Sequence, residues 1–98
     1  MAVIAVSRWK VNIEQARPVA REIAPLLKAQ GATSVRIGAC HAGPDAGKVY
    51  VAIAFADWAG YGRAMQALSA DPQYQRIYAE ALKIGELVDR SLITAEDL

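Results

Sequence analysis

Cys40 and His41 are the side chains of this sequence that most directly suggest catalysis, because they are adjacent and each is the only residue of its type. A thiol beside an imidazole is the pairing that activates a nucleophile. The segment that contains them alternates like a strand, however, and neighbouring strand residues point to opposite faces. The two side chains therefore do not readily meet within one chain.

His41 alone is the best candidate for a catalytic acid or base, since an imidazole titrates near neutral pH. The alternative is a histidine that faces solvent at the end of a strand. Cys40 is most simply a small buried hydrophobe. The sequence holds no glycine-rich phosphate loop, no Gly-x-Ser-x-Gly elbow, no paired-histidine motif and no carboxylate dyad. We therefore predict neither a metal site nor a cofactor.

Side chains along residues 49–56 alternate in size, with large residues at the odd positions and mostly small residues at the even positions. We expect the large face to meet the helices and the small face to look into a space between two sheets. Small side chains leave room for a ligand, and apolar walls with a few polar groups are typical of a small-molecule site. The predicted ligand contacts are Ser7, Trp9, Arg36, Cys40 and Tyr50. In the alternative interpretation, the small residues only let two sheets pack closely.

Several aromatic and basic residues allow two interpretations. Trp9 either caps a pocket or is buried against a partner subunit. Arg36 either binds an anionic ligand or is solvated or paired with a carboxylate such as Asp89. Tyrosines on the apolar stripes of their helices are expected to pack in the core with the hydroxyl reaching a partner, and a ligand role is the alternative; these are Tyr61, Tyr74 and Tyr78.

The elements that must position these residues follow from periodicity and capping signals. Asn12, with Gln15 completing a capping box, starts a helix that Gly31 ends, although Pro18 moves the expected start towards Arg17. Further helices begin after Asp57 and at Asp71-Pro72, and strands are predicted at 2–11, 35–42, 49–56 and 87–93. The order β-α-β-β-α-α-β is the split βαβ pattern of an α+β, ferredoxin-like domain, with a four-stranded antiparallel-type sheet.

The strands at 2–6 and 49–56 are apolar on both faces, whereas the chain has helices to cover only one face of the sheet. We expect a second copy of the chain to cover the other face and to enclose a small cavity. The predicted partner is therefore the chain itself, in a homodimer.

Composition limits the class of protein. The 98 residues fit one ferredoxin-like domain over 1–98, and 54% hydrophobic residues with 21% charged imply more buried area than one small core provides. A formal charge of +1 without a basic run argues against nucleic acid as a partner. The sequence has no export signal and no apolar run long enough to span a membrane, so we expect a cytoplasmic protein without a membrane partner.

Two segments carry a resemblance to a known group. The run from Phe55 to Trp58, leading through Ala67-Leu68-Ser69-Ala70 to Asp71-Pro72, and the ending Val88-Asp89-Arg90-Ser91-Leu92, resemble the dimeric α+β barrel superfamily, which includes NIPSNAP-like proteins, EthD-like proteins and antibiotic-biosynthesis monooxygenases. The resemblance implies a dimeric α+β barrel. Haem-degrading members use an asparagine, a tryptophan and a histidine where this chain has Ser7, Ala67 and Tyr78, so the resemblance does not extend to haem degradation.

Two classes of function follow. The first is a small-molecule-binding or assembly protein of this barrel type, which holds a small hydrophobic ligand between sheets or is purely structural. The alternative is a cofactor-independent enzyme, such as a monooxygenase, isomerase or dehydratase, in which confinement and one acid or base suffice. The sequence leaves open whether the protein is an enzyme, because this fold carries many unrelated functions.

Overall fold

The structure, a computed structural model, describes residues 1–98 as four strands and three helices in the predicted order. The elements are β1 (Ala2–Lys10), α1 (Ile13–Ala29), β2 (Ser34–Ala39), β3 (Val49–Phe55), α2 (Trp58–Ser69), α3 (Pro72–Ile84) and β4 (Glu86–Ala95). The sheet order is β2-β3-β1-β4, and every neighbouring pair is antiparallel. The ferredoxin-like fold is confirmed, with β1 and β3 in the centre of the sheet.

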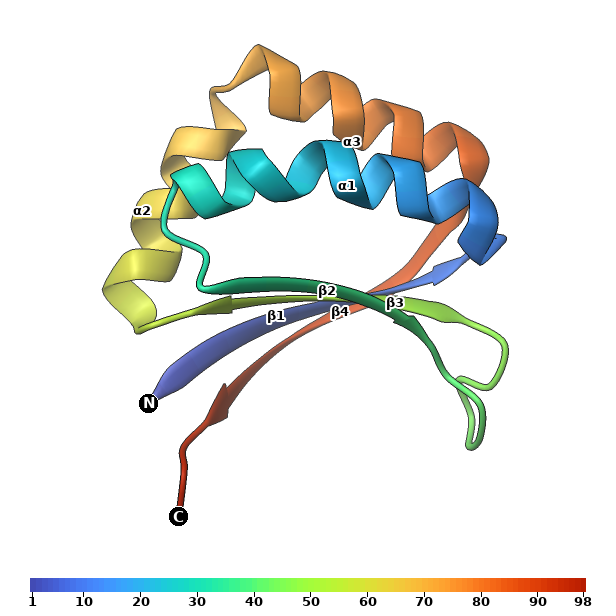
Figure 1. Ribbon diagram of the computed structural model, residues 1–98, viewed down its shortest axis with the longest axis horizontal. Coiled ribbons are helices and arrows are strands. Elements are labelled where there is room, and N and C mark those ends of the chain that lie inside the picture. Colours follow the sequence, from blue (N-terminus) through green and yellow to red (C-terminus); the bar gives the residue numbers. More distant parts are fainter.

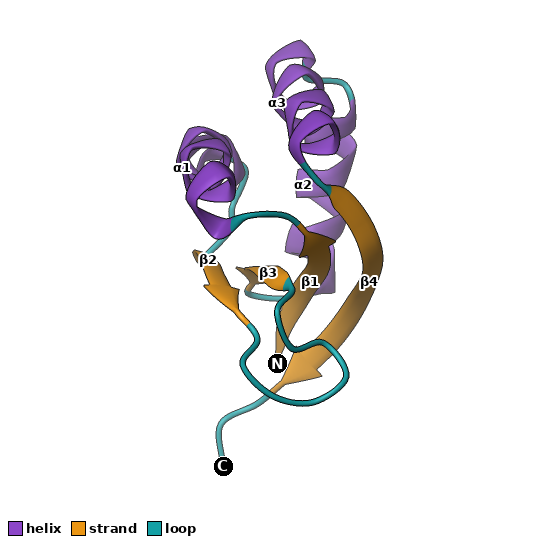
Figure 2. Ribbon diagram, turned by 90° about the vertical axis from the view of Figure 1, so that its right-hand side faces the viewer, coloured by secondary structure: helices purple, strands orange, loops and turns teal.

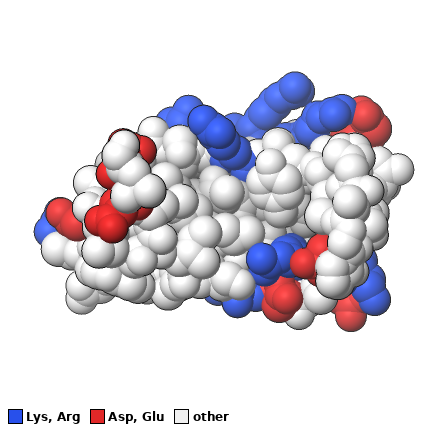
Figure 3. All heavy atoms as spheres, turned by 90° about the horizontal axis from the view of Figure 1, so that it is seen from below, with Lys and Arg blue, Asp and Glu red and all other residues white.

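All three helices lie on one side of the sheet (Figures 1 and 2). No helix lies on the opposite side, which we call the outer face, and only the loop between β2 and β3 reaches it at one end (Figure 2), where Asp45 lies 3.3 Å from Arg8. Figure 3 looks onto this face and shows charged side chains towards the rim with a broad uncharged area between them. None of the helices is long and apolar enough to cross a membrane.

Three side-chain caps fix where the helices begin. Asn12 Oδ1 accepts a hydrogen bond from the amide of Glu14 at 2.8 Å, so α1 begins at Ile13 and the later start expected near Arg17 is wrong. The reciprocal bond of a capping box is not formed. Asp57 caps α2 through the amide of Gly60 at 2.7 Å, and Asp71 caps α3. Each oxygen satisfies an amide that has no partner within its own helix.

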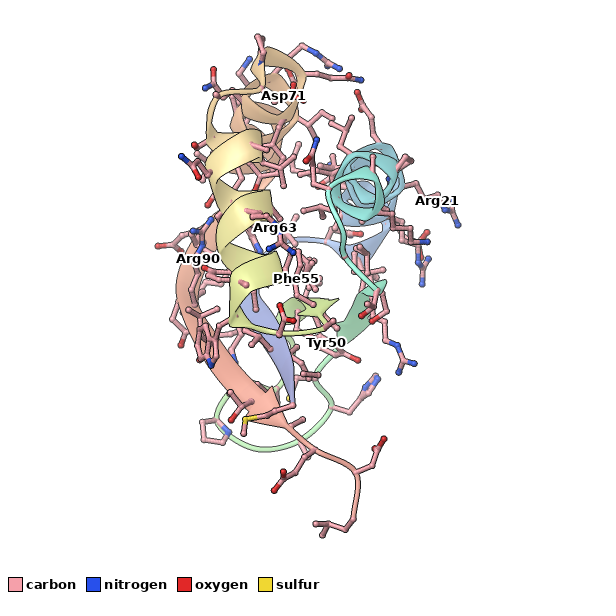
Figure 4. The ribbon with its side chains drawn as sticks, turned by 90° about the vertical axis from the view of Figure 1, so that its left-hand side faces the viewer. Arg21, Tyr50, Phe55, Arg63, Asp71 and Arg90 are labelled. Carbon is pink, nitrogen blue, oxygen red and sulfur yellow. The ribbon has the colours of Figure 1, made fainter.

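The main cluster of buried residues lies at the end of the sheet where β3 leads into α2. Phe55 is fully buried there against Leu27 of α1 and Leu68 of α2. Figure 4 shows Phe55 between the sheet and α2. The odd residues of β3 meet the helices, as predicted, with Val49 and Phe55 both buried.

The register of β1 differs from the prediction. Ser7 is the partner of Val51 and Trp9 is the partner of Val49, whereas Tyr50 is the partner of Arg8. Because directly opposed residues point to the same side of a sheet, Ser7 and Trp9 face the helices, and the expectation that they share a face with Tyr50 is wrong. Sequence periodicity sorts the residues of each strand onto two faces. Only the pairing register shows which face of one strand lies on the same side of the sheet as which face of its neighbour.

Candidate functional site

A pocket of about 480 Å³ lies between the sheet and the helices. Of the 23 residues that line it, 20 are hydrophobic, and they come from all three helices and all four strands. Several positions that face the hollow from the helices are alanines, namely Ala16, Ala20 and Ala81. Larger side chains at these positions would fill the space, so the hollow follows from side-chain size at specific helix positions.

Polar groups gather where β1 and β4 run side by side. Ser7 of β1 and Arg90 of β4 are partners across the strand pair, and both line the pocket. Trp9, two residues further along β1 and therefore on the same face, donates its indole N–H to Ser7 Oγ at 2.8 Å. Only 8% of Trp9 is exposed. Its ring is thus held against the sheet as part of the pocket wall.

Tyr78 of α3 closes this polar end from the helix side. Arg90 donates a hydrogen bond from Nη2 to the Tyr78 hydroxyl, and the centre of its guanidinium lies 5.3 Å from the centre of the Tyr78 ring. The rings of Trp9 and Tyr78 meet edge to face with their centres 6.1 Å apart, and Tyr74 lies 6.2 Å from Tyr78. Three aromatic rings and one guanidinium therefore form a continuous wall.

Arg90 is the only charged residue that lines the pocket, and it forms no salt bridge. Its side chain is exposed and lies beside α2 (Figure 4). Burial raises the pKa of the Tyr74 phenol above its usual value of 10.0, an effect that the positive charge of Arg90 partly offsets. The Tyr74 hydroxyl is therefore neutral at physiological pH.

The structure places the predicted site residues in three different positions: in the pocket, on the outer face, and after the end of β2. Ser7 and Trp9 line the pocket. Arg36 and Tyr50 lie on the outer face, where Arg36 is the partner of Ala52 and forms no salt bridge, since Asp89 pairs with Arg8 instead. Their role in ligand binding stays a prediction.

Cys40 and His41 follow β2 and do not line the pocket. The Cys40 thiol donates to the carbonyl of Ala42 at 3.1 Å, and it is only partly buried. His41 is exposed. Its role as a catalytic acid or base also stays a prediction, but the structure places it outside the pocket.

Sequence reasoning missed Arg90 as a pocket residue, and β4 explains why. A bulge opposite Arg8 and Trp9 pairs Trp9 with Leu87 and Arg8 with Asp89, so that Val88 is an extra residue. Leu87 faces the helices, so strict alternation along β4 would place Arg90 on the outer face. The extra residue in the bulge reverses this, and Arg90 faces the helices as well. Tyr74 and Tyr78 carried a sequence signal, their place on the apolar stripe of α3, but that signal also fits core residues.

Comparisons with known proteins agree on the fold. No family model matches the sequence, and no curated protein matches it significantly. Several solved structures, in contrast, match the structure of this chain. SnoaB from Streptomyces nogalater, described as a cofactor-independent oxygenase, aligns with a TM-score of 0.72 at 18% identity over 99% of this chain and 95% of its own. The chain shares its fold with SnoaB.

Two NIPSNAP proteins are similar to the same degree. One from Agrobacterium tumefaciens, of unknown function, aligns with a TM-score of 0.72 at 12% identity over 94% of this chain and 86% of its own. An uncharacterised NIPSNAP domain protein from Burkholderia xenovorans gives 0.70 at 14% identity over 96% and 94%. The fold that the resemblance implied is therefore confirmed, since the chain shares it with these proteins.

Proposed function

We propose that the pocket between the sheet and the helices binds a small, largely apolar molecule, with one polar group of that molecule directed at Ser7, Tyr78 and Arg90. The observation that supports this most strongly is the convergence of these three polar side chains at one end of an otherwise apolar hollow. Its volume falls within the range of about 300–1,000 Å³ that small-molecule pockets occupy. The ligand would thus be held within each chain, not between two sheets as the sequence suggested.

Loose packing alone is a poor explanation of the hollow. Protein interiors are packed about as densely as organic crystals and contain few voids larger than a water molecule. Here the walls combine alanines that make room with aromatic rings that stand at the edge of the space. This combination supports a cavity that is kept open for a ligand.

The test is binding of N-phenyl-1-naphthylamine, a neutral aromatic probe that fluoresces in apolar surroundings. At 100 times its Kd a ligand adds about 2.7 kcal/mol of stability, which raises the Tm of a chain of this size by about 10–20 °C. We expect saturable binding at one site per chain together with such a rise in Tm. Probe fluorescence that stays at the level of free solution would refute the proposal.

A cofactor-independent enzyme is the second candidate, favoured by the shared fold with SnoaB. Tyr78 and Ser7 offer hydroxyl groups that can hold or move a proton at the polar end of the pocket. The test is oxygen consumption by the purified protein with electron-rich phenols, compared with the Tyr78→Phe and His41→Ala variants. Loss of turnover only in His41→Ala would assign the chemistry to the loop and not to the pocket.

We also propose that the outer face forms a homodimer interface. Ile4 and Ala54 are partners on this face, Ile93 is the partner of Ile4 from β4, and Ile93 is 47% exposed. Apolar side chains at neighbouring positions across three strands form a surface that burial against a second copy would stabilise. Arg36 and Tyr50 would then contact the partner subunit. A chain that is monomeric at micromolar concentration would contradict this proposal.

A further inference from the structure

The polar end of the pocket offers hydrogen-bond donors and no acidic acceptor. Arg90 uses one of its N–H groups on Tyr78, and its remaining donors have no partner within the chain. No aspartate or glutamate lines the pocket, so its only formal charge is positive. Because Arg90 is exposed, these donors are free to meet a ligand, and a ligand that carries an oxyanion would offer them a charged acceptor.

Two neighbouring hydroxyl groups strengthen this preference. Ser7 Oγ accepts the indole N–H of Trp9, and the Tyr78 oxygen accepts from Arg90, so the proton of each hydroxyl is left to be donated. A hydroxyl that accepts from a cation is also polarised and becomes a stronger donor. Three donors therefore face the same end of the pocket from β1, β4 and α3.

The aromatic rings beside these donors favour a planar ligand. Trp9 and Tyr78 meet edge to face, and Tyr74 continues the same wall. Planar aromatic ligands gain from offset or edge contacts with such rings, in addition to the area that they bury. Cationic aromatic ligands would gain from the same ring faces, but Arg90 repels them at close range.

We infer that the ligand of this pocket is an aromatic oxyanion, a planar molecule bearing a carboxylate, sulfonate or phenolate group that Arg90, Tyr78 and Ser7 bind while its ring lies against Trp9 and Tyr78. This inference rests on the proposed function, because it names the class of ligand for the same site. It makes Arg90 the residue that determines specificity for charge.

Two fluorescent probes with one skeleton test the inference. N-phenyl-1-naphthylamine is neutral, and 8-anilinonaphthalene-1-sulfonate is the same ring system with a sulfonate beside the amine. The Kd of each is measured by titration at low and high salt. We expect the two probes to compete, and we expect only the affinity for the sulfonate to fall as salt is raised, because salt screens charge pairs.

Variants of Arg90 separate charge from shape. Because an exposed charge pair contributes less than a buried one, Arg90→Gln should raise the Kd of the sulfonate about fivefold to tenfold and raise the Kd of the neutral probe by a clearly smaller factor. Arg90→Lys should keep part of the affinity, because it keeps the charge but loses the fork of donors. Tyr78→Phe should cost about threefold for the sulfonate only.

Two control variants remove the same charge elsewhere. Arg21 of α1 points away from the molecule into solvent (Figure 4), and Arg36 lies on the outer face. Neither lines the pocket. Arg21→Gln and Arg36→Gln should leave the Kd of both probes within twofold, so that a general loss of positive charge is distinguished from loss of Arg90.

The outcomes separate the two proposals. If the neutral probe does not bind, the proposed function fails. If the neutral probe binds and Arg90→Gln leaves the sulfonate affinity unchanged, the pocket stands and the oxyanion inference is overturned. Weaker sulfonate binding in Arg36→Gln in place of Arg90→Gln would move the anion site to the outer face and overturn the inference as well.

Discussion

Ser7 of β1 and Arg90 of β4 are partners across an antiparallel strand pair, and both side chains point to the helix-covered side of the sheet. The two strands pair along almost their whole length, from Ala2 with Ala95 to Lys10 with Glu86. Polar groups on such strands are held more rigidly than groups on a loop. The pair should therefore keep its geometry whether or not a ligand is present.

Filling the pocket should abolish binding without unfolding the protein. Ala20 of α1 lines the hollow, so Ala20→Leu would place three additional carbon atoms in it. We expect the Kd of N-phenyl-1-naphthylamine to rise at least about tenfold, while the free energy of unfolding changes by less than about 1 kcal/mol or increases. The exposed Ala29, on the same helix, gives the control Ala29→Leu. A loss of about 1–3 kcal/mol in Ala20→Leu would mean that no free space exists there.

A charge on the outer face should break the proposed dimer. Ile4 lies on this face between Ala54 and Ile93, so Ile4→Asp would bury a carboxylate between two copies. Because an unpaired buried charge costs several kcal/mol, the dimer Kd should rise at least about a hundredfold in light scattering coupled to size exclusion. Leu82 of α3 is 50% exposed and provides the matched control Leu82→Asp. Equal dimer content in Ile4→Asp and the unaltered chain would exclude this face as the interface.

Gly38 and Tyr50 should show strong coupling. They are partners on the outer face, and a Cβ added at Gly38 would lie 2.6 Å from the Tyr50 ring. Gly38→Ala should therefore destabilise the chain by about 1 kcal/mol as the ring is displaced, although alanine is otherwise the better strand residue. In a Tyr50→Ala background the same substitution should be neutral or stabilising. A double-mutant cycle by chemical denaturation measures the difference, and additive effects would show that the ring does not rest on Gly38.

Tyr74 should make the protein less stable at alkaline pH. Burial raises the pKa of this phenol in the folded state, so above pH 10 the unfolded chain loses the proton first. The free energy of unfolding is therefore unaffected by the ionisation of Tyr74 below the unfolded pKa of about 10. It falls as the pH rises from there towards the pKa of Tyr74 in the folded state. Tyr74→Phe should flatten this decline in denaturation experiments between pH 9 and about 11, and Tyr50→Phe serves as a control. An unchanged decline in Tyr74→Phe would mean that other groups cause it.

Local signals in the sequence were sufficient for the fold. Asp71-Pro72 and Asp57 predicted two helix starts correctly, and Gly31, which has a φ of 105°, ends α1 in the left-handed conformation that favours glycine. These signals act within a few residues of the chain. The alternation along β3 likewise identified which of its faces meets the helices.

The site depended on information that local patterns do not carry. Whether Ser7 shares a side with Val51 or with Tyr50 depends on the pairing register of two strands far apart in the chain. The place of Arg90 depends in addition on one extra residue in β4. The sequence therefore identified Ser7 and Trp9 as candidates but assigned them to the wrong face. It did not identify Arg90, the charged residue that lines the same pocket.

The bulge at Val88 decides which of two adjacent, oppositely charged side chains borders the pocket. Asp89 lies on the outer face and pairs with Arg8 at 3.0 Å, while Arg90 lies on the helix side, where it borders the pocket and remains exposed. A slip of β4 by one position would exchange them, bringing a carboxylate into the hollow and setting two arginines against each other outside. Proteins of this architecture could thus change their preference between anionic and cationic ligands by gaining or losing one residue in the last strand, although Leu92, which lines the pocket from the same strand, would turn outward together with Arg90.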